Sequence, residues 1–446
     1  MYTVGMKKII LLTLTTTFLL SAPKTSVIFM IGDGMGPAYT TAYRYYKDNN
    51  TSHKINQTVF DTILGGMNST YSHNSVITDS AAAATALASG YKTDNGLIGL
   101  KTHHGEKIQT LLEAAKHKGY ITGLAATSTI THATPAAFIA KGAHLRDREA
   151  EIAKDFFKTT ENGKLKFDLL IGGGEKYFAE AFKDFNQTAK EHGLSIYRKG
   201  YNLEDIKHFP FIAFTSYDYP PFAIDEKEDN KYRVTKMTEK SLELLKDKPF
   251  FLMVESSQID WCGHINDIAC AMAEMNDFAK AIKTAKAYVD MHPDTLLIVT
   301  ADHSTGGLAI GDKVNKKDMH LSESERAKTY TWYPQVIKKI NASSYTIAKG
   351  LRESKDIETT FKEYTSITLT QNESRQIKEA ITDKNKKVRV IVNEIINKRS
   401  HTGWSTLGHT AVDVQTFSYG KGSQKFKGFM DNTDIAKKLF EVLSGK

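Results

Sequence analysis

Ten residues near the N-terminal end read Val27-Ile28-Phe29-Met30-Ile31-Gly32-Asp33-Gly34-Met35-Gly36. The apolar run over residues 27–31 is typical of a buried strand in a parallel sheet. Glycines follow at once and allow the backbone to turn tightly around one carboxylate, Asp33. Such a turn is weak evidence alone, and it lacks the Lys and Ser/Thr ending of a P-loop. The stretch therefore predicts a buried strand that ends beside a carboxylate.

Similar apolar runs alternate with helical patterns along the rest of the chain. The predicted strands cover residues 27–31, 121–126, 167–171, 250–254, 296–300 and 412–419. Predicted helices include residues 108–118, before Gly119, and residues 267–291, before Pro293. This alternation predicts an α/β fold, with a largely parallel central β-sheet flanked by helices on both faces.

Two segments differ from this core. Residues 1–22 combine Lys7-Lys8, an apolar run and a small-residue end, which is typical of a secretory signal peptide. The run is shorter than the roughly 20 apolar residues that span a bilayer, so we expect a periplasmic or secreted protein without a stable membrane span. Residues 23–446 then form one α/β domain. From about residue 311 to 398 the composition changes to Lys, Glu, Ser and Thr, which predicts an inserted, crown-like surface subdomain.

The charge pattern and the cysteine content argue against two classes of protein: nucleic-acid-specific binders and disulfide-rich domains. The net charge of +8 comes from lysines that are mixed with Asp and Glu along the chain. This pattern indicates a solvated surface and no nucleic-acid-specific binding. The only cysteines, Cys262 and Cys270, exclude a framework of several disulfides. The two could pair only with favourable geometry, and we expect free, partly buried thiols.

The best candidate nucleophile lies in residues 77–90, Ile-Thr-Asp-Ser-Ala-Ala-Ala-Ala-Thr-Ala-Leu-Ala-Ser-Gly. The alanine-rich part from about 81 to 89 predicts a short helix with Gly90 as its left-handed C-terminal cap. Ser80 then lies at the helix N-terminus, where free N–H groups and the helix dipole favour anions such as phosphate. An ordinary capped, buried helix is the alternative interpretation.

Metal-binding side chains follow three predicted strands and precede the last one. In open α/β sheets the functional crevice lies beyond the carboxyl ends of the strands, so we expect these side chains to converge. Asp260 and His264 can share one helical face and bind Zn²⁺, whereas Glu255 is a hard oxygen ligand suited to Mg²⁺. A surface Asp–His pair is the alternative for residues 260 and 264. The candidates are Asp33, Glu255, Asp260, His264, Asp302, His303 and His409, with His401 competing with His409.

Six segments occur in the order typical of one enzyme family. They cover residues 31–36, 78–82, 132–136, 255–264, 300–303 and 408–410. On these residues the chain resembles the alkaline phosphatases over nearly its whole mature length. The resemblance implies hydrolysis of phosphate monoesters at alkaline pH, through a phosphoserine on Ser80, with two Zn²⁺ and one Mg²⁺. The family is often dimeric, which leaves a homodimer open.

The resemblance also assigns roles to individual residues. The implied ligands are Asp260, His264 and His409 for the first zinc, Asp33, Asp302 and His303 for the second, and Asp33, Thr134 and Glu255 for magnesium. His132 and Trp261 replace the residues of many relatives beside the magnesium, which implies weaker binding or extra waters there. Trp261 has simple packing as an equal alternative.

The arginine expected to clamp phosphate is less clearly placed. Arg146 lies one residue beyond the family's usual spacing, and Arg148 is the competitor. A guanidinium matches phosphate geometry better than an ammonium does, and we favour Arg146. We expect surface or packing roles for the histidines without a strand-end context, His53, His73, His103, His104, His117 and His144.

Two other functions compete with the phosphomonoesterase. One is a phosphodiesterase or related phosphoryl-transfer hydrolase on the same metal scaffold. The other is a metal- or phosphate-binding protein without turnover, which the complete set of nucleophile and ligand positions disfavours.

Overall fold

The computed structural model describes residues 24–48, 54–101, 105–141, 145–160, 162–226, 233–246, 248–315, 317, 322–383 and 386–446. The predicted signal peptide, residues 1–22, lies outside this part of the chain. Among the helices of the described residues, none is long and apolar enough to cross a membrane.

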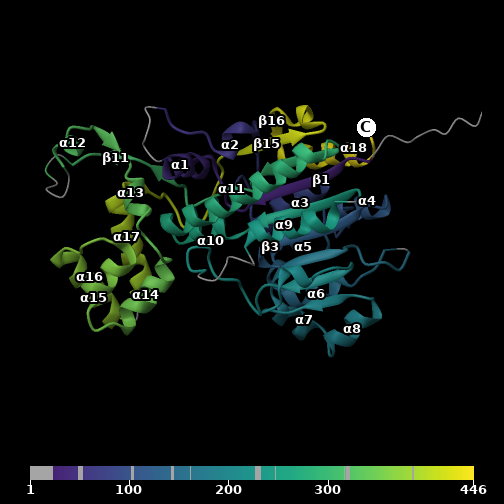
Figure 1. Cartoon of the computed structure of the whole chain (residues 1–446), viewed down its shortest axis with the longest axis horizontal. Helices are drawn as coiled ribbons and strands as arrows, with labels where there is room; N and C mark the ends of the chain where they lie inside the picture. The colour runs from purple at the N-terminus through teal and green to yellow at the C-terminus, as the bar shows by residue number, and fades with distance from the viewer. Residues whose placement is uncertain are drawn as a thin grey trace, which may run out of the picture.

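A ten-stranded sheet forms the centre of the molecule, in the order β16-β2-β15-β8-β1-β7-β3-β4-β6-β5 (Figure 1). The run from β8 to β5 is parallel throughout, whereas β15 is antiparallel to both of its neighbours. The strands are β1 (Ser26–Gly32), β2 (Leu64–Ser69), β3 (Ile121–Thr129), β4 (Leu169–Gly173), β5 (Ser195–Tyr197), β6 (Phe211–Phe214), β7 (Phe250–Ser256), β8 (Thr295–Thr300), β15 (Val414–Gly420) and β16 (Gly428–Asp431). The predicted largely parallel sheet is therefore confirmed.

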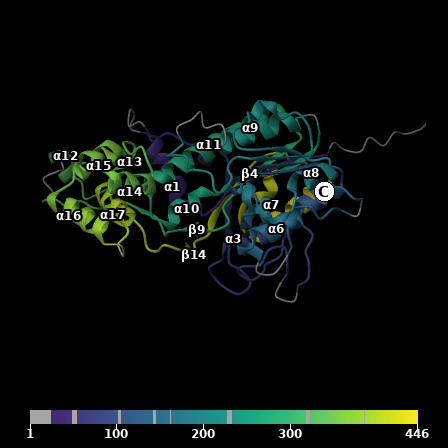
Figure 2. The same ribbon diagram turned by 90° about the horizontal axis from the view of Figure 1, so that it is seen from below.

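Helices cover both faces of this sheet because its strands are apolar on both sides. Along β1, Val27, Phe29 and Ile31 pack into one apolar cluster, while Ile28 and Met30 pack into another on the opposite face. Figure 2 shows α9 and α11 on one side of the sheet and α3, α6 and α7 on the other. The helices around the sheet are α1 (Pro37–Lys47), α2 (Val59–Thr62), α3 (Ser80–Ser89), α4 (Leu111–His117), α5 (Ala133–Ala137), α6 (Glu149–Phe156), α7 (Glu175–Ala181), α8 (Phe185–Glu191), α9 (Val234–Leu245), α10 (Gln258–His264), α11 (Ile268–Met291) and α18 (Asn432–Leu443).

The predicted helices and strands match the structure closely. Gly90 has the left-handed conformation that ends α3, as expected. The helix predicted over residues 108–118 begins later, at Leu111, because Thr110 and Glu113 form a capping box that fixes its first turn. The short strands β2, β5, β6 and β16 were not predicted, and they complete the ten-stranded sheet.

Residues 311–398 lie to one side of the sheet and contain mostly helices, drawn in green in Figure 1. Buried residues of this helical lobe, such as Ile347, Phe361 and Val392, belong to the same apolar cluster as Ile28 beneath the sheet. The lobe thus shares the core of the molecule. That these residues form an inserted subdomain stays a prediction. The elements here are β11 (Asp312–Lys313), α12 (Glu323–Arg326), β12 (Tyr330–Thr331), α13 (Pro334–Ile337), α14 (Ser344–Glu353), α15 (Ile357–Thr365), α16 (Gln371–Thr382) and α17 (Val388–Ser400).

The two cysteines contradict the expectation of free thiols. Cys262 in α10 and Cys270 in the first turn of α11 form a disulfide, with their Cα atoms 5.6 Å apart. The turn between the two helices brings the side chains together, which the spacing of eight residues did not reveal. Both cysteines are fully buried.

Candidate active site

The predicted metal-binding residues converge at the carboxyl ends of three adjacent strands. Ile31 of β1 lies opposite both Glu255 of β7 and Thr300 of β8 in the parallel register. Asp33 and Asp302 therefore leave neighbouring strands one or two residues later and enter the same crevice. A hydrogen bond links the two segments that follow these strands, because the N–H of Gly34 donates to Oδ1 of Asp302 at 3.0 Å. The fold therefore brings the side chains that follow these strands close together.

One cluster surrounds the candidate nucleophile. Asp33, Asp302 and His303 offer ligand atoms that all lie within 4.8 Å of one another. Nε2 of His303 lies 3.2 Å from Oδ2 of Asp302 and 3.5 Å from Oδ1 of Asp33. The same Nε2 lies 3.3 Å from the hydroxyl of Ser80. A cation held by this cluster would therefore adjoin the Ser80 oxygen.

A second cluster lies on the other side of His303 and joins Asp260, His303 and His409. His264, one turn of α10 after Asp260, has its Nε2 3.3 Å from the carboxylate of Asp260 and 3.2 Å from Nε2 of His409. Backbone carbonyls orient both outer imidazoles: Leu407 accepts from His264 at 2.6 Å, and Thr78 lies 2.9 Å from Nδ1 of His409. Such bonds fix which ring nitrogen faces a metal.

A third cluster contains Asp33, His132 and Glu255. Asp33 thus belongs to two clusters and lies between them. Thr134 is fully buried in α5, two residues after His132. The ring of His132 meets the edge of Trp261 at a centroid distance of 5.8 Å, so Trp261 packs beside this cluster.

Ser80 occupies the first turn of α3, as the sequence predicts. The helix cap is the neighbouring residue, Asp79, whose carboxylate accepts from the N–H of Ala82 at 2.9 Å. Because Asp79 performs the capping, the Ser80 hydroxyl is not needed for it and faces His303 instead. A nucleophile so placed lies within the positive end of the helix dipole.

The two candidate arginines have different surroundings. Arg146 donates from Nη1 to Oδ2 of Asp79 at 2.5 Å, which places its guanidinium beside the residue that precedes Ser80. Arg148 is largely exposed and pairs with Glu151 at 3.3 Å. A guanidinium has five N–H donors, so the bond to Asp79 leaves donors for a phosphate. This geometry favours Arg146 over Arg148.

Comparison with known proteins agrees with this geometry. A family model for alkaline phosphatase matches residues 24–444, nearly the whole chain. The chain belongs to the alkaline phosphatase family. As a member, it is an enzyme that hydrolyses phosphate monoesters.

Several relatives and solved structures match this chain over most of its length. Alkaline phosphatase 3 of Bacillus subtilis is 41% identical over 94% of this chain and 88% of its own. A cold-active alkaline phosphatase from Shewanella sp. is 39% identical, with a TM-score of 0.83 over 94% of this chain and 99% of its own. The alkaline phosphatase of the Antarctic bacterium TAB5 is 27% identical, with a TM-score of 0.69 over 94% and 98% of the two chains.

The donor atoms of this alkaline phosphatase fit metal cations. Both oxygens of Asp33, Oε1 of Glu255 and Oδ2 of Asp302 are buried, and none has a hydrogen-bond partner among the described residues. Buried carboxylates are costly unless they are paired or bind a metal. Burial, followed by the negative charges of Asp302, Asp260 and Glu255, raises the pKa of Asp33 well above its usual range. A bound cation would allow these carboxyls to ionise together.

The same crowding predicts how pH affects the metal-free protein. Burial raises the pKa of Glu255 to about 8 and that of Asp302 to about 7. A carboxyl with a raised pKa holds its proton more tightly in the folded chain than in the unfolded one, so its ionisation destabilises the fold. We therefore expect the metal-free protein to lose stability as pH rises through 7 and 8. Thermal unfolding in chelator at pH 6 and pH 9 measures this, and an equal or higher melting temperature at pH 9 would contradict it.

Some residues of the site were not recognised from the sequence. The hydroxyl of Thr305 donates to Oδ1 of Asp260 at 2.5 Å and lies 3.2 Å from Nδ1 of His303, so it orients two ligand candidates. Only its position five residues after the strand β8 could have indicated it. The carbonyl groups of Thr78 and Leu407 carry no sequence signal, because every residue has one.

The remaining histidines lie away from the three clusters or outside the described residues. His401, the competitor of His409, ends α17 and packs against Tyr333 at 4.9 Å between ring centroids. His73 pairs with Asp94 at 2.7 Å, and His117 ends α4. Of the histidines expected to have surface or packing roles, four lie outside the described residues: His53, His103, His104 and His144.

Proposed function

We propose that this chain is an exported alkaline phosphatase that hydrolyses phosphate monoesters through a phosphoserine on Ser80. The observation that carries the proposal is the position of the Ser80 hydroxyl, at the N-terminus of α3 and 3.3 Å from His303 in a cluster of metal-ligand side chains. Export rests on the predicted signal peptide, residues 1–22. The homodimer stays a prediction, which light scattering of the purified protein can test.

Three cations would complete the site. We assign two Zn²⁺ to the clusters on either side of His303, because imidazole and carboxylate ligands suit zinc. We assign one Mg²⁺ to the carboxylates of Asp33 and Glu255, which are hard oxygen ligands. The proposed ligands are Asp260, His264 and His409 for the first zinc, Asp33, Asp302 and His303 for the second, and Asp33, Thr134 and Glu255 for magnesium, with His132 and Trp261 beside it. A TAB5 alkaline phosphatase in which one histidine is replaced by aspartate binds Mg in its M3 site, which supports a magnesium position in this family.

The metals supply charge that stabilises the attacking and departing oxygens of an in-line displacement. The protein supplies the nucleophile and the orientation. Ser80 Oγ loses its proton and forms a bond to phosphorus while the bond to the ester oxygen breaks, and the departing alkoxide takes up a proton to leave as the alcohol. Water then loses a proton and adds to the same phosphorus, the bond to Ser80 Oγ breaks, Ser80 Oγ regains a proton, and inorganic phosphate leaves. The N–H groups at the start of α3 and the guanidinium of Arg146 hold the non-bridging oxygens in both steps.

A comparison of two synthetic esters tests this function. The chelated, purified protein should release phosphate from p-nitrophenyl phosphate at alkaline pH only after Zn²⁺ and Mg²⁺ are added back. Turnover of bis-p-nitrophenyl phosphate should remain far slower. A preference for the diester would make the chain a phosphodiesterase on the same scaffold. Metal-restored turnover of neither ester would leave a binding protein.

Replacing each candidate arginine separates their roles. We expect Arg146→Ala to lower kcat/KM for p-nitrophenyl phosphate by about 10- to 100-fold, the size of a lost hydrogen bond to a charged group. Arg148→Ala removes an exposed ion pair and should change kcat/KM by less than about twofold. Inhibition by inorganic phosphate should weaken in parallel in Arg146→Ala. A larger loss for Arg148→Ala would reverse the assignment.

A further inference from the structure

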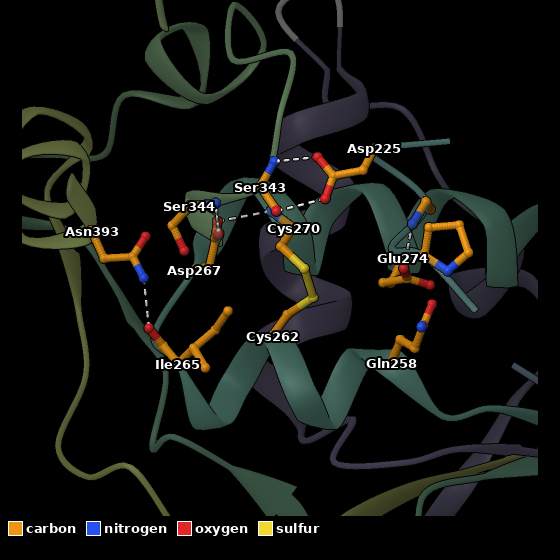
Figure 3. The surroundings of a disulfide bond; sticks show 12 residues. Asp225, Gln258, Cys262, Ile265, Asp267, Cys270, Glu274, Ser343, Ser344 and Asn393 are labelled. Carbon is orange, nitrogen blue, oxygen red and sulfur yellow. Dashed lines mark hydrogen bonds between the residues drawn. A yellow bond between two sulfur atoms is a disulfide. The ribbon is translucent and has the colours of Figure 1, made fainter. Parts of the chain in front are cut away.

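The disulfide ties the short helix that carries two metal-ligand candidates to the helix that follows it. Asp260, Cys262 and His264 all belong to α10, and Cys270 belongs to the first turn of α11. Figure 3 shows the sulfur–sulfur bond running from α10 to α11. Cys262 and Cys270 are the only cysteines in the sequence.

Helical geometry places the disulfide behind the metal-binding face of α10. Residues four apart lie on the same face of a helix, so Asp260 and His264 point the same way, toward His409. Cys262 lies two residues from each of them and therefore on the opposite side of the helix. The disulfide anchors α10 from the side that faces away from the metal site.

The face of α10 toward the site is closely packed. A Cβ atom on Gly263 would come within 2.4 Å of the Tyr39 hydroxyl oxygen, and one on Gly34 would come within 2.7 Å of the Cα atom of Asp260. The helix thus has no room to move toward the crevice. Movement away from the crevice is opposed by the disulfide to α11, together with the burial of Ile259 and the bonds of Gln258 to Pro220 and Arg233.

The turn between the two helices is held at other points as well. Asp267 caps α11 by accepting from the N–H of Cys270 at 3.0 Å, and its other oxygen accepts from the N–H of Ser344 at 2.7 Å. Asn393 of α17 donates to the carbonyl of Ile265 at 2.7 Å, as Figure 3 also shows. These contacts fix the turn to the helical lobe. The N–H of Asp267 also donates to the carbonyl of Cys262 at 3.0 Å, so the disulfide adds a covalent link between side chains to a backbone bond at the same place.

We propose that the Cys262–Cys270 disulfide is a positioning element that keeps Asp260 and His264 in place as metal ligands and slows metal release from them. This inference rests on the proposed zinc site of Asp260, His264 and His409. A bond that closes a loop of only eight residues constrains the unfolded chain less than a long-range bond would. Its main effect is local, on the position of α10. Of the two ligands, His264 depends more on the disulfide. Its side chain is partly exposed and is held by contacts with Asp260, His409 and the Leu407 carbonyl.

Zinc release from a variant without the bond tests this inference. We expect Cys262→Ala/Cys270→Ala, loaded with zinc, to transfer the metal to a chromophoric chelator about tenfold faster than the wild type, or more, as for other residues that support metal ligands. Excess Zn²⁺ should restore kcat in the variant, with KM for p-nitrophenyl phosphate within about twofold of the wild-type value. Cys262→Val/Cys270→Ala restores side-chain volume without the bond and should release zinc as fast as the double alanine variant.

A matched control separates positioning from stability. Ile282 is fully buried in α11 but lies farther along the helix, so Ile282→Ala weakens the packing of α11 without touching α10. It should lower the unfolding temperature yet release zinc at the wild-type rate. The inference would be overturned if both cysteine variants released zinc at the wild-type rate, or if Ile282→Ala released zinc as fast as they do. If Asp260→Ala binds as much zinc as the wild type does, the proposed zinc site itself is wrong, whatever the cysteine variants show.

Discussion

Replacing Ser80 by alanine should lower kcat for p-nitrophenyl phosphate by about 10³-fold or more, because the attacking oxygen is removed while the rest of the site remains. The fold should tolerate the change. Asp79, and not Ser80, caps α3, and alanine is the best helix former for the first turn. The substitution leaves the carboxylates and imidazoles of the three clusters in place, so zinc content should stay near the wild-type level.

The control for this prediction is a second serine on the same helix. Ser89→Ala removes a hydroxyl that donates to the carbonyl of Thr85 at 2.6 Å, far from the metal clusters. It should cost some stability and leave kcat near the wild-type value. Steady-state rates, metal analysis and thermal unfolding of the three proteins measure these outcomes. A Ser80→Ala enzyme that kept more than a tenth of its rate would exclude Ser80 as the nucleophile.

Replacing Asp33 by asparagine should remove metal binding at two positions at once. Asp33 belongs to both the cluster with Asp302 and His303 and the cluster with His132 and Glu255. An amide is neutral and a weaker ligand than a carboxylate, so kcat/KM should fall by about 10³-fold or more as the charge stabilisation of both cations is lost. Metal analysis after dialysis should find less zinc and less magnesium in Asp33→Asn than in the wild type.

The same substitution should have the opposite effect on the metal-free protein. Burial and the charges of Asp302, Asp260 and Glu255 disfavour ionised Asp33, and the amide removes that repulsion. In chelator at alkaline pH, Asp33→Asn should therefore unfold at a higher temperature than the wild type. Added Zn²⁺ should stabilise the wild type more than the variant. Asp155→Asn is the control, because Asp155 is a buried carboxylate that accepts from the Lys141 N–H and lies outside the clusters. It should lose stability and keep its metals, whereas unchanged metal content in Asp33→Asn would contradict the proposed ligand set.

The sequence predicted that several candidate site residues lie close together, because they follow buried strands. Asp33, Asp302 and His303 come one to three residues after apolar runs, and parallel strands bring such positions together regardless of the intervening chain. The helix that begins at Ser80 was predicted from alanine content and a C-terminal glycine, both of which are local properties. Local patterns were therefore sufficient to place the candidate nucleophile and these candidate ligands.

What the sequence did not reveal depends on tertiary contacts. The strand β2, which lies between β16 and β15, contains two glycines and is only partly buried, so it lacks the apolar pattern of the central strands. The apolar pattern of β15 does not indicate whether the strand runs parallel or antiparallel to its neighbours. The pairing of Cys262 with Cys270 depends on the turn between α10 and α11, and the role of Thr305 depends on the position of Asp260. No residue pattern encodes these contacts directly.

Acid-quenched turnover tests the central claim most directly. Metal-loaded enzyme is mixed with a phosphate monoester, stopped in acid within the turnover time, digested and analysed by mass spectrometry. The proposed mechanism predicts a phosphoryl group on Ser80 that is present during turnover and absent both without substrate and after chelation. A wild-type enzyme that turns over rapidly without a phosphorylated Ser80 peptide, under conditions that preserve a synthetic phosphoserine peptide, would contradict it.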